Sequence, residues 1–361
     1  MCNKNAIKVV DRLLQNIMEN ELPFGGKVVI FGGDFRQVLP VVPRQGRPGI
    51  TGQIFKKLPW WRSVESLSLT INERVKRNSD NEEGRSFSRF LLQIGEGKVP
   101  CHPDIGKDMI RVPDHYVFQS QNPIDFIKWC YPNLHLENAN VAGKAILAPK
   151  NVEVDFLNHA ALDLMQGSPI ELKSADELQP EDPQEHFLFP VEFLQTIDPP
   201  GMPPHILRVK VGAPAILLRN IDAKKGLCNG TRLTIRNVSP RLLTVEIMNG
   251  SHQGQIAYLP RMDLINTEGT YPFTFKRRQF PIKLAFAMTI NKAQGQSLEH
   301  VGVYLPVPVF GHGQLYVALS RSGVPANTKL LIINLPGIQG TFPNKDGVYT
   351  KNVVYPEVFS V

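Results

Sequence analysis

Residues 27–41 read KVVIFGGDFRQVLPV, and this stretch decides the fold class. The unbroken apolar run at 28–31 predicts a strand that is buried on both faces, as in a parallel sheet. Two glycines follow and allow the backbone to turn, so Asp34 and Gln37 emerge at the carboxyl end of the strand. Ligands bind at that edge in open α/β sheets. We therefore predict an α/β fold with a ligand site directly after residue 33.

Asp34 and Gln37 suit a site that senses phosphate. A carboxylate and an amide at a sheet edge can sense a metal-bound phosphate and orient an attacking water, which is the role of a glutamine in several nucleotide hydrolases. The alternative is that Asp34 caps a helix and that Gln37 is solvated.

A second pattern of the same kind lies near the other end of the chain. The loop TINKAQGQ at 289–296 precedes the segment GHGQLYVALSR at 311–321, whose apolar residues recur at helical spacing. A glycine and a proline follow as stop signals. This geometry places Arg321 at the end of a packed helix, pointing off it. The alternative is that Arg321 is there because the C-terminal end of a helix attracts a cation.

The rest of the chain alternates between helical and strand patterns. An apolar stripe that starts at Ile7 predicts an amphipathic helix over 5–20, packed on the first sheet. Region 180–204 holds seven prolines and is interpreted as a linker, and short alternating segments at 206–260 predict a small β-barrel. The other expected elements are helices at 87–94 and 152–165 and buried strands at 145–148, 283–289, 301–306 and 329–335.

The composition is that of an ordinary soluble globular protein, long enough for two or three domains. Of 361 residues, 42% are hydrophobic and 20% are charged, and the net charge is +7. No apolar run approaches the ~20 residues that span a bilayer, and the amino terminus lacks the apolar core of a secretory signal. The four cysteines are scattered, so we expect a reducing compartment and no structural zinc.

The charge is unevenly distributed along the chain. Residues 150–206 carry two basic and eleven acidic side chains, whereas 207–283 carry thirteen basic and four acidic, a change from −9 to +9. A basic, strand-rich segment suits a groove that follows a phosphate backbone, and the alternative is a solvated basic face. The cluster at 276–278 has the alternative of a nuclear import signal. Four aromatic residues nearby are either base-stacking platforms or core: Tyr258, Tyr271, Phe273 and Phe275.

Together these segments resemble the Pif-type DNA helicases of superfamily one, particularly the branch carried by Helitron transposons. The similarity covers nearly the whole chain, and six blocks stand in family order. They are PFGGKVVIFGGDFRQVLPVV (23–42) and LTINERVKR (69–77), which look like the third and fourth motifs; ILAPKNVEVDFLN (146–158) and VGAPAILLRNIDAKKGLCNGTRLTI (211–235), which look like the body of the second motor domain; and LAFAMTINKAQGQSL (284–298) and LYVALSR (315–321), which look like the fifth and sixth.

The resemblance implies two RecA-like α/β domains, with ATP in the cleft between them and single-stranded DNA running across both. The expected domains are the carboxyl-terminal part of the first RecA-like P-loop domain at 1–68, the first part of the second RecA-like domain at 69–185, a small β-barrel insertion at 186–280, and the remainder of the second domain at 281–361.

The resemblance also implies catalytic roles for four residues. Asp34 and Gln37 are expected to sense magnesium and the γ-phosphate. Arg74 and Arg321 are expected to be arginine fingers, each placing a fixed fork of donors on charge that builds in the transition state. For Arg74 the alternative is a surface ion pair with Glu73.

Five further residues receive binding roles from the same resemblance. Gln294 and Gly295 are expected to line the nucleotide cleft. Thr289, Asn291 and Lys292 are expected to meet the DNA backbone and to couple its position to closure of the cleft. Asn291 departs from the histidine that is common in related helicases.

The loop that cradles phosphates in ATP hydrolases, Gly-x-x-x-x-Gly-Lys-Ser/Thr, has no counterpart in this sequence. Around Gly26 and Lys27 the first glycine is replaced by Glu21 and the hydroxyl residue by Val28, and no strand ending in a paired Asp-Glu comes before them. In the resembled family both features lie further upstream. We therefore expect an amino-terminally truncated helicase in which Met1 is an internal methionine and the magnesium ligands lie largely upstream.

The implied function is an ATP-dependent DNA helicase that uses ATP and Mg²⁺ to move 5′ to 3′ along single-stranded DNA and to unwind forked duplexes. The implied location is the nucleus or the mitochondrion, and DNA repair, recombination, telomere maintenance and Helitron mobilisation all use such a motor. For the chain as written, the alternative is a non-enzymatic single-stranded DNA-binding fragment, because arginine fingers without a phosphate cradle have nothing to act on. A nuclease or transposase is disfavoured, since neither a carboxylate cluster with metal-ligand spacing nor a two-histidine motif is found. No membrane partner is expected.

Overall fold

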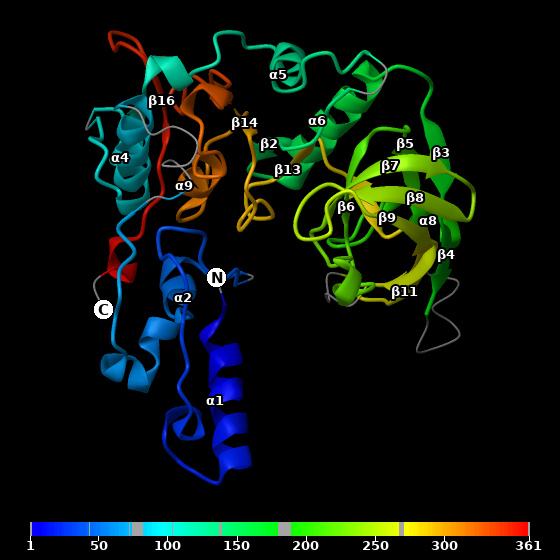
Figure 1. The fold of residues 1–361 in the computed structure, drawn as a ribbon. Coiled ribbons are helices and arrows are strands. Elements are labelled where there is room, and N and C mark those ends of the chain that lie inside the picture. Colours follow the sequence, from blue (N-terminus) through cyan, green and yellow to red (C-terminus); the bar gives the residue numbers. More distant parts are fainter. Residues whose placement is uncertain are drawn as a thin grey trace. The chain divides into compact units, whose positions relative to one another are not determined.

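The computed structural model describes residues 2–42, 44–71, 73, 82–102, 104–136, 139–179, 189–266 and 271–359. The chain forms two compact units (Figure 1). Unit 1 comprises Met1–Gln121, Leu147–Pro149 and Thr289–Val361, and unit 2 comprises Asn122–Ile146 and Lys150–Met288. None of the described helices is both long and apolar enough to cross a bilayer.

A four-stranded sheet provides the α/β character that the sequence predicts. Its strands, in order, are β13 (Ala287–Thr289), β2 (Lys144–Ala148), β14 (His300–Leu305) and β15 (Thr328–Ile332). The chain passes between the two units within β2 and within β13. β14 and β15 pair in parallel, and both are apolar runs buried along almost their whole length. The strands predicted at 145–148, 301–306 and 329–335 are therefore confirmed, whereas the one predicted at 283–289 divides into β13 and a second short strand, Ile282–Leu284, which belongs to another sheet.

Two helices of unit 1 follow the predicted apolar spacing. Helix α4 (Glu82–Glu96) buries Phe87, Leu91 and Ile94 and packs against the short helix α9 (Gln314–Leu319). Unit 1 also contains α2 (Arg47–Thr51) and an antiparallel pair of strands, β1 (Met109–Val112) and β16 (Val348–Lys351).

Helix α1 (Lys4–Met18), also predicted, is fixed by one buried carboxylate. Asp11 accepts a hydrogen bond from the backbone N–H of Phe24 at 2.6 Å and another from Trp60 Nε1 at 3.2 Å. The indole of Trp60 stacks on the ring of Phe31, with ring centroids 5.7 Å apart. Aromatic side chains therefore hold α1 to the segment that follows it.

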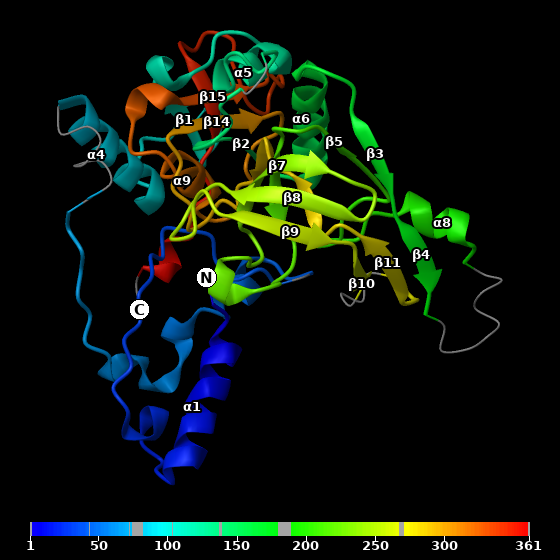
Figure 2. The same ribbon diagram turned by 45° about the vertical axis from the view of Figure 1, so that its right-hand side comes forward.

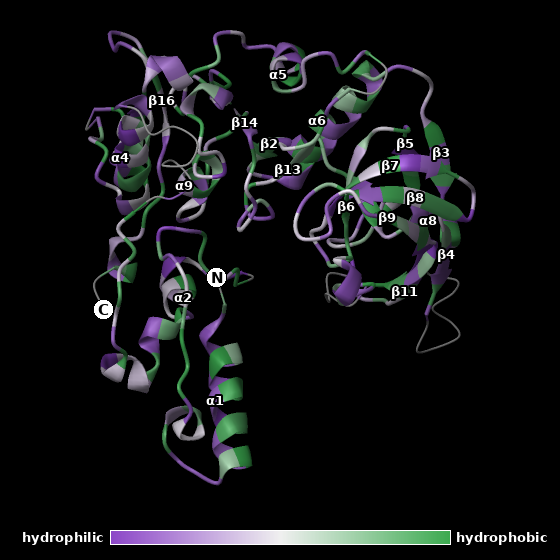
Figure 3. Cartoon of the chain, viewed as in Figure 1, coloured by the Kyte–Doolittle hydropathy of each residue, from purple (hydrophilic) through white to green (hydrophobic). Residues whose placement is uncertain are grey.

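The strand predicted at 27–33 does not form, so this expectation was wrong. The segment has no regular secondary structure, and Val28 and Ile30 are 94% and 91% exposed. The apolar face of α1 is also exposed at Val10 and Ile17 (Figure 3), so α1 does not pack on a sheet as expected. A strand needs a neighbour for its backbone hydrogen bonds, and no part of the chain that the structure describes provides one for 27–33.

The largest sheet of unit 2 is five-stranded and antiparallel (Figure 2). Its predicted strands are confirmed, but its pairing leaves the first and last strands as edges among the described residues. The sheet is therefore open, and the expected β-barrel is not seen. In order, its strands are β12 (Ile282–Leu284), β6 (Pro214–Leu217), β7 (Arg232–Val238), β8 (Leu242–Ile247) and β9 (Ile256–Pro260).

Helix α8 (Val191–Thr196) lies within the region predicted to be a linker, which corrects that prediction for the described residues. Its proline precedes the first turn, where a missing N–H costs nothing. The remaining elements of unit 2 are helices α5 (Pro123–Cys130) and α6 (Asn151–Leu164), the strand pair β3 (Ile170–Lys173) and β5 (Ile206–Val209), and a three-stranded sheet of β10 (Met262–Ile265), β11 (Phe275–Gln279) and β4 (Ala175–Leu178).

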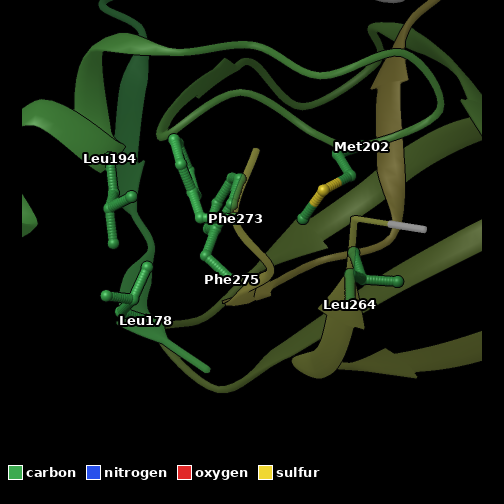
Figure 4. Close-up of a cluster of buried hydrophobic side chains, with 6 residues drawn as sticks. All are labelled: Leu178, Leu194, Met202, Leu264, Phe273 and Phe275. Carbon is green, nitrogen blue, oxygen red and sulfur yellow. The ribbon is translucent and has the colours of Figure 1, made fainter. Parts of the chain in front are cut away.

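A hydrophobic cluster joins α8 to the three-stranded sheet (Figure 4). Its buried members are Leu178, Leu194, Met202, Leu264, Phe273 and Phe275. The two phenylalanines are therefore core residues and not stacking platforms. Tyr271 packs against the same cluster, whereas Tyr258 is exposed.

Candidate functional site

The beginning of α9 lies against the loop that follows the apolar run at 28–31. Gly313, the residue before the helix, has a φ of 72°, a left-handed conformation that favours glycine. A Cβ at this position would collide with the carbonyl oxygen of Arg36 and with the backbone of Gln37. Glycine is therefore required for the close approach of these two backbones.

His312 and Tyr316 hold the same loop by hydrogen bonds. His312 Nδ1 accepts from the backbone N–H of Tyr355 at 2.9 Å, so the neutral ring carries its proton on Nε2 and donates to the carbonyl oxygen of Phe35 at 2.8 Å. The hydroxyl of Tyr316 donates to Asp34 Oδ2 at 2.9 Å. Burial and the adjacent Asp34 carboxylate raise the pKa of Tyr316 to about 12, so the hydroxyl keeps its proton near neutral pH.

The Asp34 carboxylate also closes the loop on itself. Its Oδ1 accepts from the backbone N–H of Arg36 at 3.0 Å and lies 3.3 Å from Arg36 Nε. The backbone N–H of Gln37 donates to the carbonyl oxygen of Asp34 at 3.1 Å. Asp34 therefore fixes a turn that presents Gln37, and the alternative of a helix cap does not hold because no helix follows.

Loop 289–298 is tied to both ends of α9. Gln314 Nε2, at the beginning of the helix, donates to Asn291 Oδ1 at 3.3 Å. Beyond the other end, Arg321 Nη1 donates to the carbonyl oxygen of Gln296 at 3.2 Å. The loop predicted to meet nucleotide and DNA is thus positioned by the helix that precedes Arg321.

All five predicted binding residues lie within this loop, including Asn291, which Gln314 contacts. Gly295 has a φ of 83°, and a Cβ there would meet no atom within 4 Å, so the space beside it is open. Thr289 Oγ1 accepts from the backbone N–H of Lys292 at 3.4 Å, which closes the first turn of the loop. Gln294 is partly buried beside Gly295, and Lys292 is exposed. Their roles toward nucleotide and DNA stay predictions.

Arg321 turns back onto α9, which corrects the expectation that it points off the helix. It is 4% exposed, and Nε donates to the carbonyl oxygen of Val317 at 2.8 Å while Nη2 donates to Ser320 Oγ at 2.7 Å. The last carbonyls of a helix lack intrahelical partners, so a guanidinium is stabilised there. This arrangement matches the predicted alternative, in which the end of the helix holds a cation. The hydrogen bonds to Val317 and Ser320 fix the direction of the side chain.

Helix α9 thus brings Asp34 and Gln37 into one assembly with Arg321. Besides burial, the Asp34 carboxylate raises the pKa of Tyr316 and the Arg321 guanidinium lowers it, so the phenol lies within electrostatic reach of both groups. Arg74, the other predicted finger, lies outside the residues that the structure describes. The arrangement places the Gln37 turn at the beginning of one short helix and the Arg321 guanidinium, bonded to Val317, Ser320 and Gln296, beyond its end.

Sequence reasoning missed the residues that build this assembly, namely His312, Gly313, Gln314 and Tyr316. Gln314 is buried, and its Oε1 accepts two backbone N–H groups of the preceding loop at 3.0 Å each. A signal was present, because polar residues within an apolar helical pattern indicate buried hydrogen bonds. Tyr316 gave no such signal, since an aromatic residue on that pattern fits a core position equally well.

His312 leads to a pH-dependent prediction. Burial lowers its pKa below the ordinary value of 6.5, and protonation would abolish acceptance of the Tyr355 N–H. A depressed pKa contributes stability that is present above pH 6.5 and lost as the pH falls through the folded value. We expect His312→Gln to flatten the fall in urea midpoint between pH 7.5 and pH 5 relative to the original chain. Equal changes of the urea midpoint with pH in the two proteins would contradict a neutral His312 that is hydrogen-bonded through both ring nitrogens.

Most basic side chains of 207–283 bind other groups within unit 2. This reduces the number of side chains that are free to form the expected basic groove. Six pair with acidic side chains: Arg208, Lys225, Arg236, Lys276, Arg277 and Arg278. Three bind backbone carbonyls: Lys210, Arg232 and Arg261. Within the described part of the chain, four side chains have no partner: Arg219, Lys224, Arg241 and Lys283. Arg219 and Lys224 both lie in the long connection between β6 and β7.

Comparisons with known proteins point to one family. Residues 1–104 match the family model described as PIF1-like helicase, and residues 192–238 match that of the 2B domain of DNA helicase Pif1. Over 316 residues the chain is 26% identical to the ATP-dependent DNA helicase PIF1 of Danio rerio, covering 87% of this chain and 42% of that protein. In these regions the chain is similar to the Pif1-like helicases.

A bacterial Pif1 is similar to the same extent. The ATP-dependent DNA helicase Pif1 of Bdellovibrio bacteriovorus is 25% identical over 318 residues, covering 88% of this chain and 60% of that protein. The chain therefore spans between two fifths and three fifths of the length of these curated Pif1 relatives.

Solved Pif1 structures share the fold. Bacteroides Pif1 bound to single-stranded DNA superposes with a TM-score of 0.63 at 21% identity, covering 93% of this chain and 69% of that chain. Pif1 from Candida albicans gives a TM-score of 0.60 at 23% identity, covering 92% and 71%. At these identities the likeness is one of fold, and it confirms the predicted α/β, RecA-like architecture.

Proposed function

We propose that this chain is the greater part of the motor of an ATP-dependent DNA helicase, which couples ATP hydrolysis to 5′ to 3′ movement on single-stranded DNA and to unwinding of forked duplexes. One observation carries the proposal: α9 holds the loop of Asp34 and Gln37 at its beginning and Arg321 at its end. A water-orienting amide and a guanidinium are the side chains that phosphoryl transfer requires near the γ-phosphate.

Each predicted residue then has a chemical task. Gln37 orients the attacking water from a turn that Asp34 has closed. Arg321 stabilises the charge that develops on the phosphoryl group, and for this at least one of its donors has to turn from Val317, Ser320 or Gln296 to the nucleotide. Thr289, Asn291 and Lys292 contact the DNA backbone from a loop joined to the same helix, which provides a mechanical link between DNA and nucleotide.

The residues present fit only one side of a nucleotide. They provide phosphate-sensing groups, but the sequence lacks a glycine-rich phosphate cradle, and no group of three or more His, Cys, Asp or Glu suited to a metal is found among the described residues. We infer that the cradle and the Mg²⁺ ligands belong to polypeptide outside these 361 residues. The exposed apolar face of α1 and the unpaired segment 27–33 support this inference, because both are suited to a sheet.

The wider setting is proposed on the resemblance alone. Residues 1–68 are taken as the end of the first motor domain, with the second domain and its insertion making up the rest. The Helitron-like branch is proposed from the sequence blocks that resemble that group, and a nuclear or mitochondrial location is proposed from where such motors act.

DNA-stimulated ATP hydrolysis tests the proposal. The 361-residue chain is expected to show no hydrolysis above background, whereas a longer version that includes the upstream reading frame is expected to hydrolyse ATP when single-stranded DNA is added. Hydrolysis by the shorter chain would refute the inference about the cradle. An upstream frame without a glycine-rich loop, or a longer protein inert toward ATP and DNA, would refute the helicase function.

A second candidate function, a non-enzymatic single-stranded DNA-binding fragment, is favoured by a separate observation. Arg219 and Lys224 are unpaired and lie in the connection between β6 and β7 of unit 2, where they can release counterions from a phosphate backbone. Under this alternative the shorter and longer chains bind single-stranded DNA equally, and neither hydrolyses ATP.

A further inference from the structure

We propose that Tyr316 is a positioning residue that couples the Gln37 turn to Arg321, an inference that rests on the proposed function. Tyr316 lies in α9, two residues after Gln314 and five before Arg321. Its hydroxyl reaches Asp34, which is far away in sequence, at 2.9 Å. Tyr316 therefore connects the two parts of the site that the chemistry would use together.

The Tyr316 hydroxyl helps to fix the orientation of the Asp34 carboxylate, and this carboxylate holds the turn at 34–37. Oδ2 accepts the Tyr316 hydroxyl, while Oδ1 accepts the backbone N–H of Arg36. The backbone carbonyl oxygen of Asp34 accepts the N–H of Gln37. Without the hydroxyl, Oδ2 loses a charge-assisted hydrogen bond, and the turn keeps only its internal contacts. The orientation of Gln37 is therefore expected to depend on Tyr316.

The packing around Tyr316 leaves its ring little freedom. Gly95 of α4 lies so close that a Cβ there would come within 2.9 Å of both Tyr316 Cδ2 and Arg36 Cδ. A glycine at 95 thus lets the phenol and the Arg36 side chain pack side by side. Movement of the Asp34 turn is transmitted to the ring, and through α9 to Arg321, because a packed helix responds as a unit.

Amide exchange in the 361-residue chain tests the contact directly, without nucleotide. Tyr316→Phe is expected to speed hydrogen exchange at Arg36 and Gln37 by about 10-fold, the effect of losing one hydrogen bond to a charged group. The matched control is Tyr349→Phe, which removes a hydroxyl that donates to the carbonyl oxygen of Asp346 at 3.1 Å in the same unit. That variant is expected to leave exchange at 36 and 37 unchanged. Unchanged exchange in Tyr316→Phe would overturn the proposal.

Kinetics of the longer protein test the coupling. Tyr316→Phe is expected to lower kcat of DNA-stimulated hydrolysis by about 10-fold, with KM for ATP and affinity for single-stranded DNA changed by less than about 2-fold. Asp34→Asn combined with Tyr316→Phe is expected to be no worse than the poorer single variant, because both act through one contact. Additive losses, or an equal rise in KM, would show that Tyr316 only supports packing.

The two tests separate this proposal from the proposed function. Faster exchange at 36 and 37 in Tyr316→Phe, combined with an original longer protein that is inert toward ATP, would refute the helicase function and with it the coupling role, while leaving the contact itself demonstrated. Normal hydrolysis by Tyr316→Phe with faster exchange would refute the coupling alone.

Discussion

Arg277→Ala is expected to lower the free energy of unfolding by about 3–5 kcal/mol, the range for breaking one side of a buried ion pair. The Arg277 side chain is fully buried. Its Nη2 donates to Asp176 Oδ2 at 2.9 Å and to the carbonyl oxygen of Leu194 at 2.8 Å, and its Nη1 donates to the carbonyl oxygen of Pro203 at 3.1 Å. The guanidinium therefore joins β11 to β4, to α8 and to the chain after it. Alanine would leave the buried Asp176 carboxylate and two carbonyl groups without this donor.

The next residue of β11 provides a matched control. The Arg278 side chain is 62% exposed and lies 3.8 Å from Asp263 at the surface. Arg278→Ala is expected to change stability by at most about 1 kcal/mol, as for exposed ion pairs. Urea unfolding of the 361-residue chain, followed by circular dichroism, measures both variants. Equal losses for Arg277→Ala and Arg278→Ala would contradict the structural role of the buried pair.

A double replacement sharpens the same test. Removing both charges with Arg277→Met and Asp176→Leu leaves no lone ion buried, and such exchanges are often close to neutral. The double variant is therefore expected to be more stable than Arg277→Ala. A double variant less stable than the single one would mean that the carbonyl groups, and not the Asp176 carboxylate, make Arg277 necessary.

Arg277 also shows that the charge of a segment does not by itself identify a binding surface. The swing from acidic to basic composition predicts a groove for phosphate, yet the central residue of the 276–278 cluster is buried against Asp176. The partner lies about one hundred residues earlier in the chain. Composition gives the sum of charges, but only the fold decides which of them face solvent.

Local patterns predicted the elements whose partners the chain itself contains. The strands β2, β14 and β15 and the helices α4 and α6 follow from apolar runs and spacing, because burial within these units satisfies the same pattern. The run at 28–31 has an equally clear pattern but forms no strand. Pairing depends on a neighbouring strand, and side-chain hydrophobicity carries no information on whether one is available.

In the candidate site, too, local patterns predicted the elements but not the contacts that depend on distant parts of the chain. Helix α9 was predicted from sequence, and Asp34, Gln37 and Arg321 were named as site candidates, whereas the direction of Arg321 and the contact of Tyr316 were not predicted. Both depend on backbone carbonyls and on a carboxylate brought near by folding. A short helix in a sequence specifies which residues share a face, but not which loop covers that face.

Arg321→Ala in the longer protein is expected to reduce kcat for ATP hydrolysis by about 10³-fold, the typical effect of losing an arginine finger. Affinity for single-stranded DNA at fixed salt is expected to change by less than about 3-fold, because Arg321 is not among the residues proposed to contact the DNA phosphates. Arg321→Lys is also expected to be severely impaired. A single ammonium cannot reproduce the fork that reaches Val317, Ser320 and Gln296 from different nitrogens.

The buried position of Arg321 makes stability part of the same experiment. Alanine removes donors from the carbonyl oxygens of Val317 and Gln296, which is expected to cost about 1–3 kcal/mol. Melting temperature and DNA affinity are therefore measured beside kcat, with Arg111→Ala as the control, because Arg111 pairs with Asp114 and Asp346 at the surface of the same unit. A loss of kcat with folding and DNA affinity retained identifies a finger. Parallel loss of kcat, DNA affinity and stability would assign Arg321 to the fold alone, because Val317, Ser320 and Gln296, which accept its hydrogen bonds, all belong to the polypeptide.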